Sequence, residues 1–165
     1  MVGISAAPIE VGDDLYVYHN GSKNHHDWWI NGMNKEVDHA EAQEDGLDLV
    51  GYALGLLKIK RDRFVSLNAV SAREGILVTR PFYCEGGKLV INAACGSDGY
   101  IKIQAVDGNT NDIIPGFKKD DCHVFSSDSV QHQFEWKSKQ ELPNGWVKLH
   151  FYLRNADLYT FEIQR

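Results

Sequence analysis

The feature that most constrains this chain is a run of short alternating segments that starts near residue 47 and continues to the C-terminus. In residues 100–106, three apolar side chains occupy every second position and alternate with Lys102 and Gln104. Successive side chains of a strand point to opposite faces, so this period of two predicts strands with one buried face. Turn pairs such as Asp-Gly and Pro-Gly separate the segments.

Residues 47–165 therefore predict an all-β domain without a convincing helix. We count about eight strands at a spacing of about 8–14 residues, which is typical of antiparallel sandwiches. The expected architecture is an antiparallel β-sandwich of jelly-roll type, concanavalin-like in its facing sheets. Predicted turns that separate its strands include Glu85–Gly87, Ser97–Gly99, Asp107–Asn111 and Leu142–Gly145.

Residues 1–46 have a different composition, and we place the boundary between the two parts after residue 46. Residues 9–19 alternate and predict strand structure with a turn at Gly12–Asp14, and Asn20-Gly21 predicts a second turn. Ser22–Gly46 has no period of two and predicts a long surface loop. Such loops are often functional or mark a join between parts of a chain.

Composition narrows the classes of partner. The chain has 165 residues, 43% of them hydrophobic, which is enough for the core of one domain. Its net charge is -6 and it has no dense cluster of Lys and Arg, so we expect neither nucleic acid nor a membrane surface as partner. A neutral or cationic partner is easier to accommodate, and neutral sugar is one candidate. The sequence shows no signal peptide and no apolar run that would span a bilayer, so we expect a soluble chain of unknown location.

The cysteines do not predict a disulfide framework. Cys84, Cys95 and Cys122 form an odd set without close spacing, which suits neither a set of bridges nor a zinc site. Cys84 and Cys95 lie in strand-like segments, so we expect buried free thiols. A single bridge stays open as the alternative.

A set of short blocks lies in a fixed order between residues 51 and 163. They are Gly-Leu-x5-Asp-x-Phe-Val-Ser-Leu (55–67), Thr-x-Pro-Phe (79–82), Gly-Gly-x-Leu-x-x-Asn (86–92), Ile-Pro-Gly-Phe (114–117), Asp-Ser-Val-x5-Trp (128–136) and Leu-Arg-Asn-Ala-Asp-Leu-Tyr-x-Phe (153–161). Their order resembles the C-terminal β-sandwich module of five-bladed β-propeller glycoside hydrolases of the sucrase/levanase-like and arabinanase-like kinds. The resemblance implies a sandwich that accompanies a glycosidase.

The N-terminal part adds to this resemblance. Asp14–Gly21 followed by His25 is similar to the closing strands of the last propeller blade in those enzymes, so residues 1–46 are interpreted as a blade remnant. The acidic catalytic residues of the family belong to earlier blades, which this chain lacks. No catalytic residue is carried over, and the resemblance implies a non-catalytic module. If the chain is an enzyme at all, a glycoside hydrolase is the expected class.

The adjacent Trp28 and Trp29 are the strongest candidates for a binding site. Aromatic faces bind the apolar face of a sugar ring, and polar neighbours fix its hydroxyls. We therefore predict a carbohydrate-binding site formed by Trp28 and Trp29 with His25, Asp27 and Tyr18. The competing interpretation is that one of the tryptophans fills a core or an interface, since Trp is usually well buried.

Metal sites are weaker candidates. The turn at Asp107, Asn109, Asn111 and Asp112 brings side-chain oxygens together, as calcium requires, but lacks the acidic residue that closes an EF-hand loop. We expect a plain turn and no cofactor, with calcium as the alternative. The histidines and aspartates of residues 19–39 match no established metal motif, so surface histidines are favoured there.

Catalytic arrangements are weaker still. Glycoside hydrolysis needs two carboxylates across a cleft, and Glu135 and Glu162 alternate with apolar neighbours as solvent-facing residues do. Cys122 and His123 are adjacent on an extended segment and therefore face opposite sides. Two functions follow for testing: a non-catalytic carbohydrate-binding sandwich, or an interaction domain that forms homo-oligomers through the edge of its N-terminal strand, Leu15–His19.

Overall fold

A computed structural model describes residues 2–4, 7–22, 52–69 and 73–165 of the chain. They divide into two compact units, Met1–Arg61 and Asp62–Arg165. Both are built from β-strands, and the described part contains only a short 3-10 turn, η1 (Lys119–Asp121), besides strands. Within it there is no helix with the length and hydropathy needed to cross a membrane.

The first unit is an antiparallel sheet with β3 (Asp14–Ser22) at its centre. β4 (Tyr52–Lys60) pairs along the whole of β3 on one side. On the other side β1 (Val2–Ile4) pairs with the end of β3 and β2 (Ile9–Val11) with its start. Gly12, with φ of +61°, makes the predicted turn between β2 and β3.

Three sequence-based expectations about this unit change. Asn20 and Gly21 lie inside β3, where they pair with Leu54 and Ala53 instead of forming a turn. Leu15–His19 is not a free edge, because β3 has strands on both sides. The boundary lies after Arg61 instead of residue 46, because β4 pairs with β3 and not with the sandwich. Pairing across a long intervening segment leaves no local signal in the sequence.

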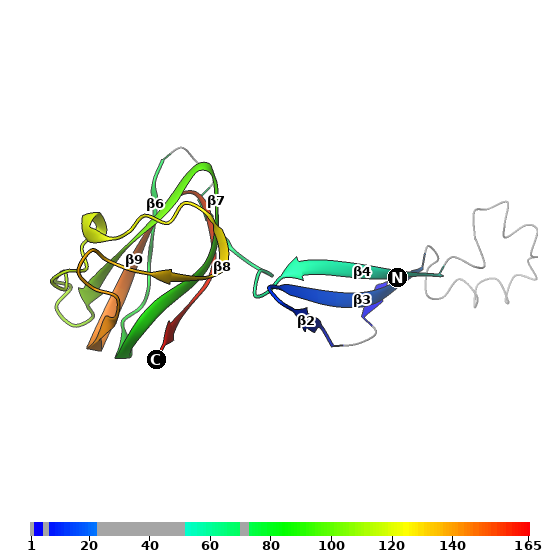
Figure 1. Cartoon of the computed structure of the whole chain (residues 1–165), viewed down its shortest axis with the longest axis horizontal. Coiled ribbons are helices and arrows are strands. Elements are labelled where there is room, and N and C mark those ends of the chain that lie inside the picture. Colours follow the sequence, from blue (N-terminus) through cyan, green and yellow to red (C-terminus); the bar gives the residue numbers. More distant parts are fainter. Residues whose placement is uncertain (1, 5–6, 23–51, 70–72) are drawn as a thin grey trace, which may run out of the picture. The chain divides into compact units, whose positions relative to one another are not determined.

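The second unit consists of five strands, of which two are long and bent (Figure 1). The strands are β5 (Leu67–Ala69), β6 (Gly75–Val78), β7 (Phe82–Asp107), β8 (Asp128–Phe134) and β9 (Leu142–Gln164). Within each paired segment of β7 and β9 the residue numbers run in opposite directions, which is antiparallel pairing. Each of these two strands contributes to both layers of the unit.

The pairing divides the strands between two layers. The first has the order β5, the end of β9 (156–164), the middle of β7 (88–95) and β8. In the second layer, β9 (142–154) is the central strand. The end of β7 (100–107) pairs with one of its edges, and β6 and the start of β7 (82–87) pair one after the other with its opposite edge. The all-β antiparallel sandwich is thus confirmed, whereas its jelly-roll type stays a prediction.

Three predicted turns are corners or bends within continuous strands. Gly86 and Gly87 have φ of +87° and +135°, and β7 changes there from pairing with residues 142–147 to pairing with 156–164. A Cβ on Gly87 would lie 2.5 Å from the backbone oxygen of Gln164, so glycine is required at this crossing. Leu142–Gly145 likewise belongs to β9. Ser97–Gly99 forms a corner of β7 opposite Asn155, and the backbone of Asn155 has a φ of +41°.

The core lies between the two layers and follows the alternation of the sequence. Ile101, Ile103 and Leu149 are fully buried, and Trp136 donates from Nε1 to the carbonyl oxygen of Ile103 at 3.0 Å. Trp136 also packs edge-on against Phe117, with ring centroids 4.9 Å apart. This tryptophan is therefore a structural residue that fills the sandwich.

The segment that follows β4 is fixed to the first layer by Arg63, whose side chain is 8% exposed. Its Nε donates to Oδ1 of Asn92 at 2.8 Å, and its guanidinium group pairs with Asp128 at 2.5 Å. The same group lies 4.7 Å from the ring centre of Tyr159. Arg63 thus connects the start of the sandwich unit to β7, β8 and β9.

The three cysteines are free thiols, as expected. Cys84 and Cys122 are buried, and Cys95 is partly buried. Burial raises the pKa of Cys95 to about 11, so the group stays protonated and weakly reactive at neutral pH.

Candidate functional site

Most of the sequence-predicted binding site lies outside the described residues. This applies to His25, Asp27, Trp28 and Trp29. Tyr18 is described: it lies on β3, is 42% exposed, and pairs across the sheet with Leu56. The carbohydrate-binding site predicted around Trp28 and Trp29 therefore stays a prediction.

A different aromatic surface lies on the outer side of the second layer of the sandwich. Along β9 the odd positions 147–153 are buried in the core, so the even positions 146–154 point outward. The outward partners on β6 are Ile76 and Val78, and those on β7 are Tyr83, Tyr100, Lys102 and Gln104. Val106, at the next even position of β7, is 1% exposed and belongs to the core. We call this surface the aromatic face; its outward β9 residues are Trp146, Lys148, His150, Tyr152 and Arg154.

One end of the aromatic face is apolar and open. Trp146 is 48% exposed and its cross-strand partner Tyr83 is 55% exposed. Their rings meet edge to face, with centroids 5.8 Å apart. The hydroxyl of Tyr83 donates to Oδ1 of Asn144 at 2.9 Å, which fixes the tyrosine. A large indole held beside a second ring on a rigid strand is a pre-formed surface for a flat apolar ligand face.

The other end of the face carries basic groups over aromatic rings. Nζ of Lys119 lies 4.1 Å from the ring centre of Tyr152. The guanidinium carbon of Arg154 and Nζ of Lys102 lie 5.3 Å and 5.7 Å from the ring centre of Tyr100. These cations cover the two tyrosine rings, so this end presents positive charge to solvent in place of bare aromatic surface.

Two carboxylates balance part of that charge. Glu74 pairs with Lys119 at 2.5 Å and accepts a hydrogen bond from the Tyr100 hydroxyl at 2.7 Å. Burial by itself raises the pKa of Glu74, but these two hydrogen bonds outweigh burial and hold the pKa below its ordinary value. Asp98 pairs with Arg154 at 3.3 Å. Both carboxylates are consequently ionised at neutral pH and engaged with partners.

Polar side chains fill the middle of the face. Lys148 contacts the side-chain oxygen of Asn111, a neutral acceptor. His150 lies opposite Gln104 on β7. Burial, and then the charge of Lys148, lower the pKa of His150, so its imidazole is neutral at neutral pH. The face thus offers hydrogen-bonding groups between an aromatic end and a basic end.

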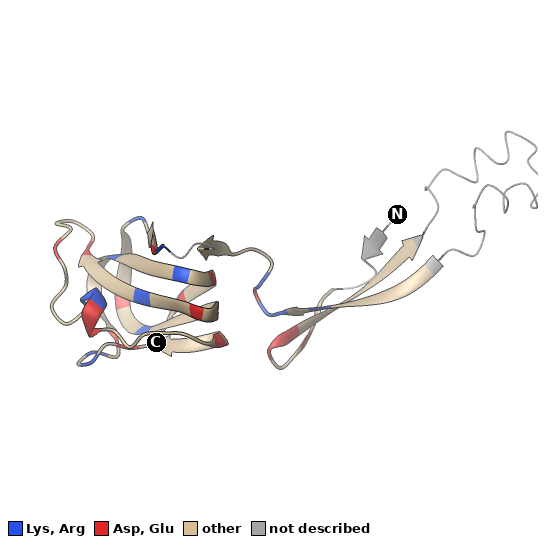
Figure 2. Ribbon diagram, turned by 90° about the horizontal axis from the view of Figure 1, so that it is seen from above, with Lys and Arg blue, Asp and Glu red and all other residues tan. Residues whose placement is uncertain are grey.

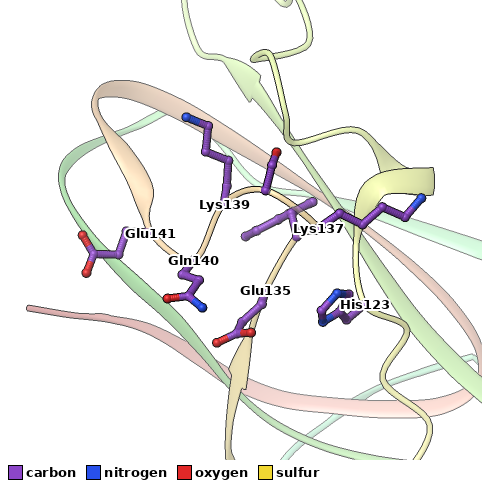
Figure 3. A pocket seen from close by; sticks show the side chains of 8 residues that line it. His123, Glu135, Lys137, Lys139, Gln140 and Glu141 are labelled. Carbon is purple, nitrogen blue, oxygen red and sulfur yellow. The ribbon is translucent and has the colours of Figure 1, made fainter.

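A hollow of about 540 Å³ lies elsewhere, beside the turn after β8. Its lining comprises His123, Glu135, Trp136, Lys137, Ser138, Lys139, Gln140 and Glu141 (Figure 3). Trp136 is 2% exposed and contributes almost no surface, while Lys137, Lys139 and Glu141 point away from one another. The hollow therefore offers no exposed Trp, Tyr or Phe ring on which a ligand could pack.

The structure also shows the surroundings of the weaker candidates from the sequence, which are the turn at Asp107, the metal sites and the Cys122–His123 pair. Asp107 accepts from the backbone N–H groups of Asn109 and Thr110 at 2.7 and 3.0 Å, which lowers its pKa and confirms the turn. Among the described residues no three His, Cys, Asp or Glu side chains gather as a metal site would need. Cys122 is buried and donates to the carbonyl of Lys119, whereas His123 is exposed, so the two do not act together.

The sequence does carry the signal of the aromatic face. The even positions of residues 146–154 are all large aromatic or basic side chains, while the odd positions are aliphatic or aromatic core residues. That pattern identifies a strand, but it does not say which neighbouring strands extend its outer face. Tyr83, Ile76 and Lys119 join the face only through the pairing and packing of the fold.

No protein-family model, no curated protein and no solved structure matches this chain.

Proposed function

We propose that this chain is a non-catalytic carbohydrate-binding protein and that the aromatic face of the sandwich holds the glycan. The observation that carries the proposal is the exposed pair of Trp146 and Tyr83 on a rigid outer sheet face. Sugar rings have an apolar face that packs on an indole, and their hydroxyls bond to polar neighbours such as Gln104 and His150.

Two further arguments support the proposal. The carboxylates of the face, Glu74 and Asp98, are engaged in ion pairs, so neither is arranged as a general acid. The ordered blocks of residues 55–161 resemble sandwich modules that accompany glycoside hydrolases. A binding role fits a sandwich of that kind without requiring catalysis by this chain.

The test is binding of the purified full chain to labelled oligosaccharides, measured with Trp146→Ala. We expect affinity to fall at least tenfold, since a central aromatic group at a binding surface is commonly worth about 2 kcal/mol. Phe64→Ala is the control, because Phe64 is 64% exposed in the same unit and lies outside the face. Equal affinities for the wild type and Trp146→Ala would contradict the proposal.

A second candidate function concerns the N-terminal sheet. Among the described strands, β4 pairs only with β3, so its other edge is open. Leu54 and Leu56 on β4 are 75% and 49% exposed. An open, apolar edge invites pairing with another strand. As this second function we propose that two copies of this chain associate through the open edge of β4. The sequence instead suggests Leu15–His19 as the contact edge.

A further inference from the structure

We propose that the aromatic face binds acidic glycans, whose carboxylate or sulfate groups are held at its basic end. This inference rests on the carbohydrate-binding function proposed above and adds the charge class of the ligand. It reverses the expectation drawn from the net charge of -6, which favoured neutral sugar.

The first step is the distribution of charge on the face. Its basic side chains are Lys102, Lys119, Lys148 and Arg154, and its carboxylates are Glu74 and Asp98. The carboxylates pair with Lys119 and Arg154, which leaves Lys102 and Lys148 without an ion pair in the described part of the chain, although the charge of Lys102 also acts on Glu74. Beyond Tyr83, Glu85 pairs with Arg165 and adds no net charge. Figure 2 shows basic positions within the strands of the sandwich, although the chain as a whole is acidic.

The second step is the position of Lys102 and Lys148, the two lysines of the face that form no ion pair with a described residue. Lys102 lies opposite Tyr152, and Lys148 lies next to Trp146 at the following outward position of β9. No carboxylate of the described residues forms an ion pair with either ammonium group. Lys148 therefore lies beside the aromatic pair and Lys102 at the far end. A polymer chain that packs on Trp146 and runs along β9 would meet both charges.

The third step is the ligand chemistry that this order of groups selects. An apolar ring surface followed by hydrogen-bonding groups and separated cations suits a polymer with sugar rings and regularly spaced anionic groups. Carboxylated and sulfated polysaccharides share that chemistry. Nucleic acid also combines rings and anions, but the overall charge of -6 opposes the long-range attraction that its binding normally uses.

The experiment compares polygalacturonate, dextran sulfate, neutral dextran and single-stranded DNA as ligands for the full chain at low and high salt. The test variant is Lys102→Gln/Lys148→Gln. The control Lys88→Gln/Lys139→Gln removes the same charge from exposed lysines elsewhere in the sandwich. We expect an acidic glycan to bind more tightly than neutral dextran. The test variant should weaken this binding about tenfold at low salt and much less at high salt.

The outcomes separate the two proposals. Selective loss of acidic-glycan binding in the test variant, with the control unchanged, supports the inference, and the polygalacturonate and dextran sulfate arms identify the anionic group. Neutral dextran bound as tightly as the acidic glycans, with Trp146→Ala still deleterious, would overturn the inference and leave the proposed function intact. An equal loss in the control, or tighter binding of DNA, would also overturn the inference. No glycan binding at all would overturn both proposals.

Discussion

The two units of this protein use the same antiparallel pairing but bury their apolar side chains very differently. In the sandwich, a continuous core includes fully buried residues such as Leu89, Ile91 and Leu149. Among the described residues of the first unit only Leu15 and Val17 are buried, while Leu54 is 75% exposed. Strand pairing by itself therefore does not make a stable unit, because stability comes mostly from apolar area removed from water.

The comparison also separates two ways to expose apolar groups. On the aromatic face, exposed rings are fixed from beneath by a full core and from the side by hydrogen bonds, such as that between Tyr83 and Asn144. On β4, exposed leucines lie at the open edge of a thin sheet. The first arrangement holds the exposed rings in place, as the proposed ligand site requires, and the second favours contact with another polypeptide.

The largest expected effect tests whether the sandwich is stable on its own core. Trp136→Ala removes a side chain that packs on Phe117 and Phe134 and donates to Ile103. We expect the free energy of unfolding of the sandwich to fall by ~3–5 kcal/mol, as for other buried aromatic residues. Denaturant unfolding in the full chain, followed by near-UV circular dichroism, measures the change.

Val17→Ala in β3 is the matched change in the other unit, since Val17 is 7% exposed. It should leave the sandwich transition within about 0.5 kcal/mol of the wild type, because Val17 belongs to the other compact unit and changes without shared partners act independently. A shift of the sandwich transition comparable to that of Trp136→Ala would show that the two units unfold as one, and would contradict a sandwich that is stable on its own core.

The next effect compares the two aromatic candidates for the glycan. Trp28→Ala/Trp29→Ala tests the pair predicted from sequence, and Trp146→Ala tests the pair on the sandwich. If the sandwich carries the site, affinity falls at least tenfold in Trp146→Ala and changes less than about twofold in the double variant. Titration of labelled oligosaccharide measures both. The reverse order would place the site at Trp28 and Trp29 and remove the aromatic face from consideration.

A smaller effect sharpens the role of the open edge. Leu56→Lys places a charge on β4, and charges on edge strands oppose pairing with other chains. If β4 joins two copies, light scattering should show a fall from dimer to monomer at micromolar concentration. Val124→Lys, at a site with 50% exposure against 49% for Leu56, is the control in the sandwich. A wild-type protein that is monomeric at high concentration would contradict pairing through β4.

The sequence predicts the fold of the sandwich well because its signals are local. The period of two at residues 100–106 and 146–154 corresponds to buried odd positions in both strands. Gly86 and Gly87 likewise mark a break in the sequence, and both have positive φ in the structure. Their role as a crossing between layers depends on the partner strand, residues 142–164, which no local pattern indicates.

The candidate site was harder to predict for the same reason. Trp146 and Tyr83 are far apart in sequence, and only the pairing of β7 with β9 brings their rings to 5.8 Å. Trp28 and Trp29 are adjacent in the chain, so the sequence indicates them directly, and the site predicted there stays a prediction. The net charge likewise describes the whole chain and conceals the basic end of one face.

The smallest expected effect concerns pH and distinguishes the core from the surface of the sandwich. Burial lowers the pKa of His132 and of His150 from the ordinary value of 6.5. The unfolded chain therefore binds more protons than the folded chain as the pH falls below about 6.5, so stability is full above this value and decreases below it. The carboxyl groups with lowered pKa values, such as Glu74 and Asp98, reduce stability only when the pH falls to about 4 and below.

The Tm should therefore fall modestly as the pH is lowered from about 7.5 to about 5, because His132 and His150 take up protons on unfolding. His132 contacts Phe125 at a centroid distance of 4.7 Å, deep beside the core, so His132→Gln should reduce the fall at some cost in Tm at neutral pH. An identical fall in His132→Gln and the wild type would show that His132 does not couple folding to pH. His150 on the aromatic face, the other histidine whose pKa burial lowers, would then be the remaining candidate for the pH dependence.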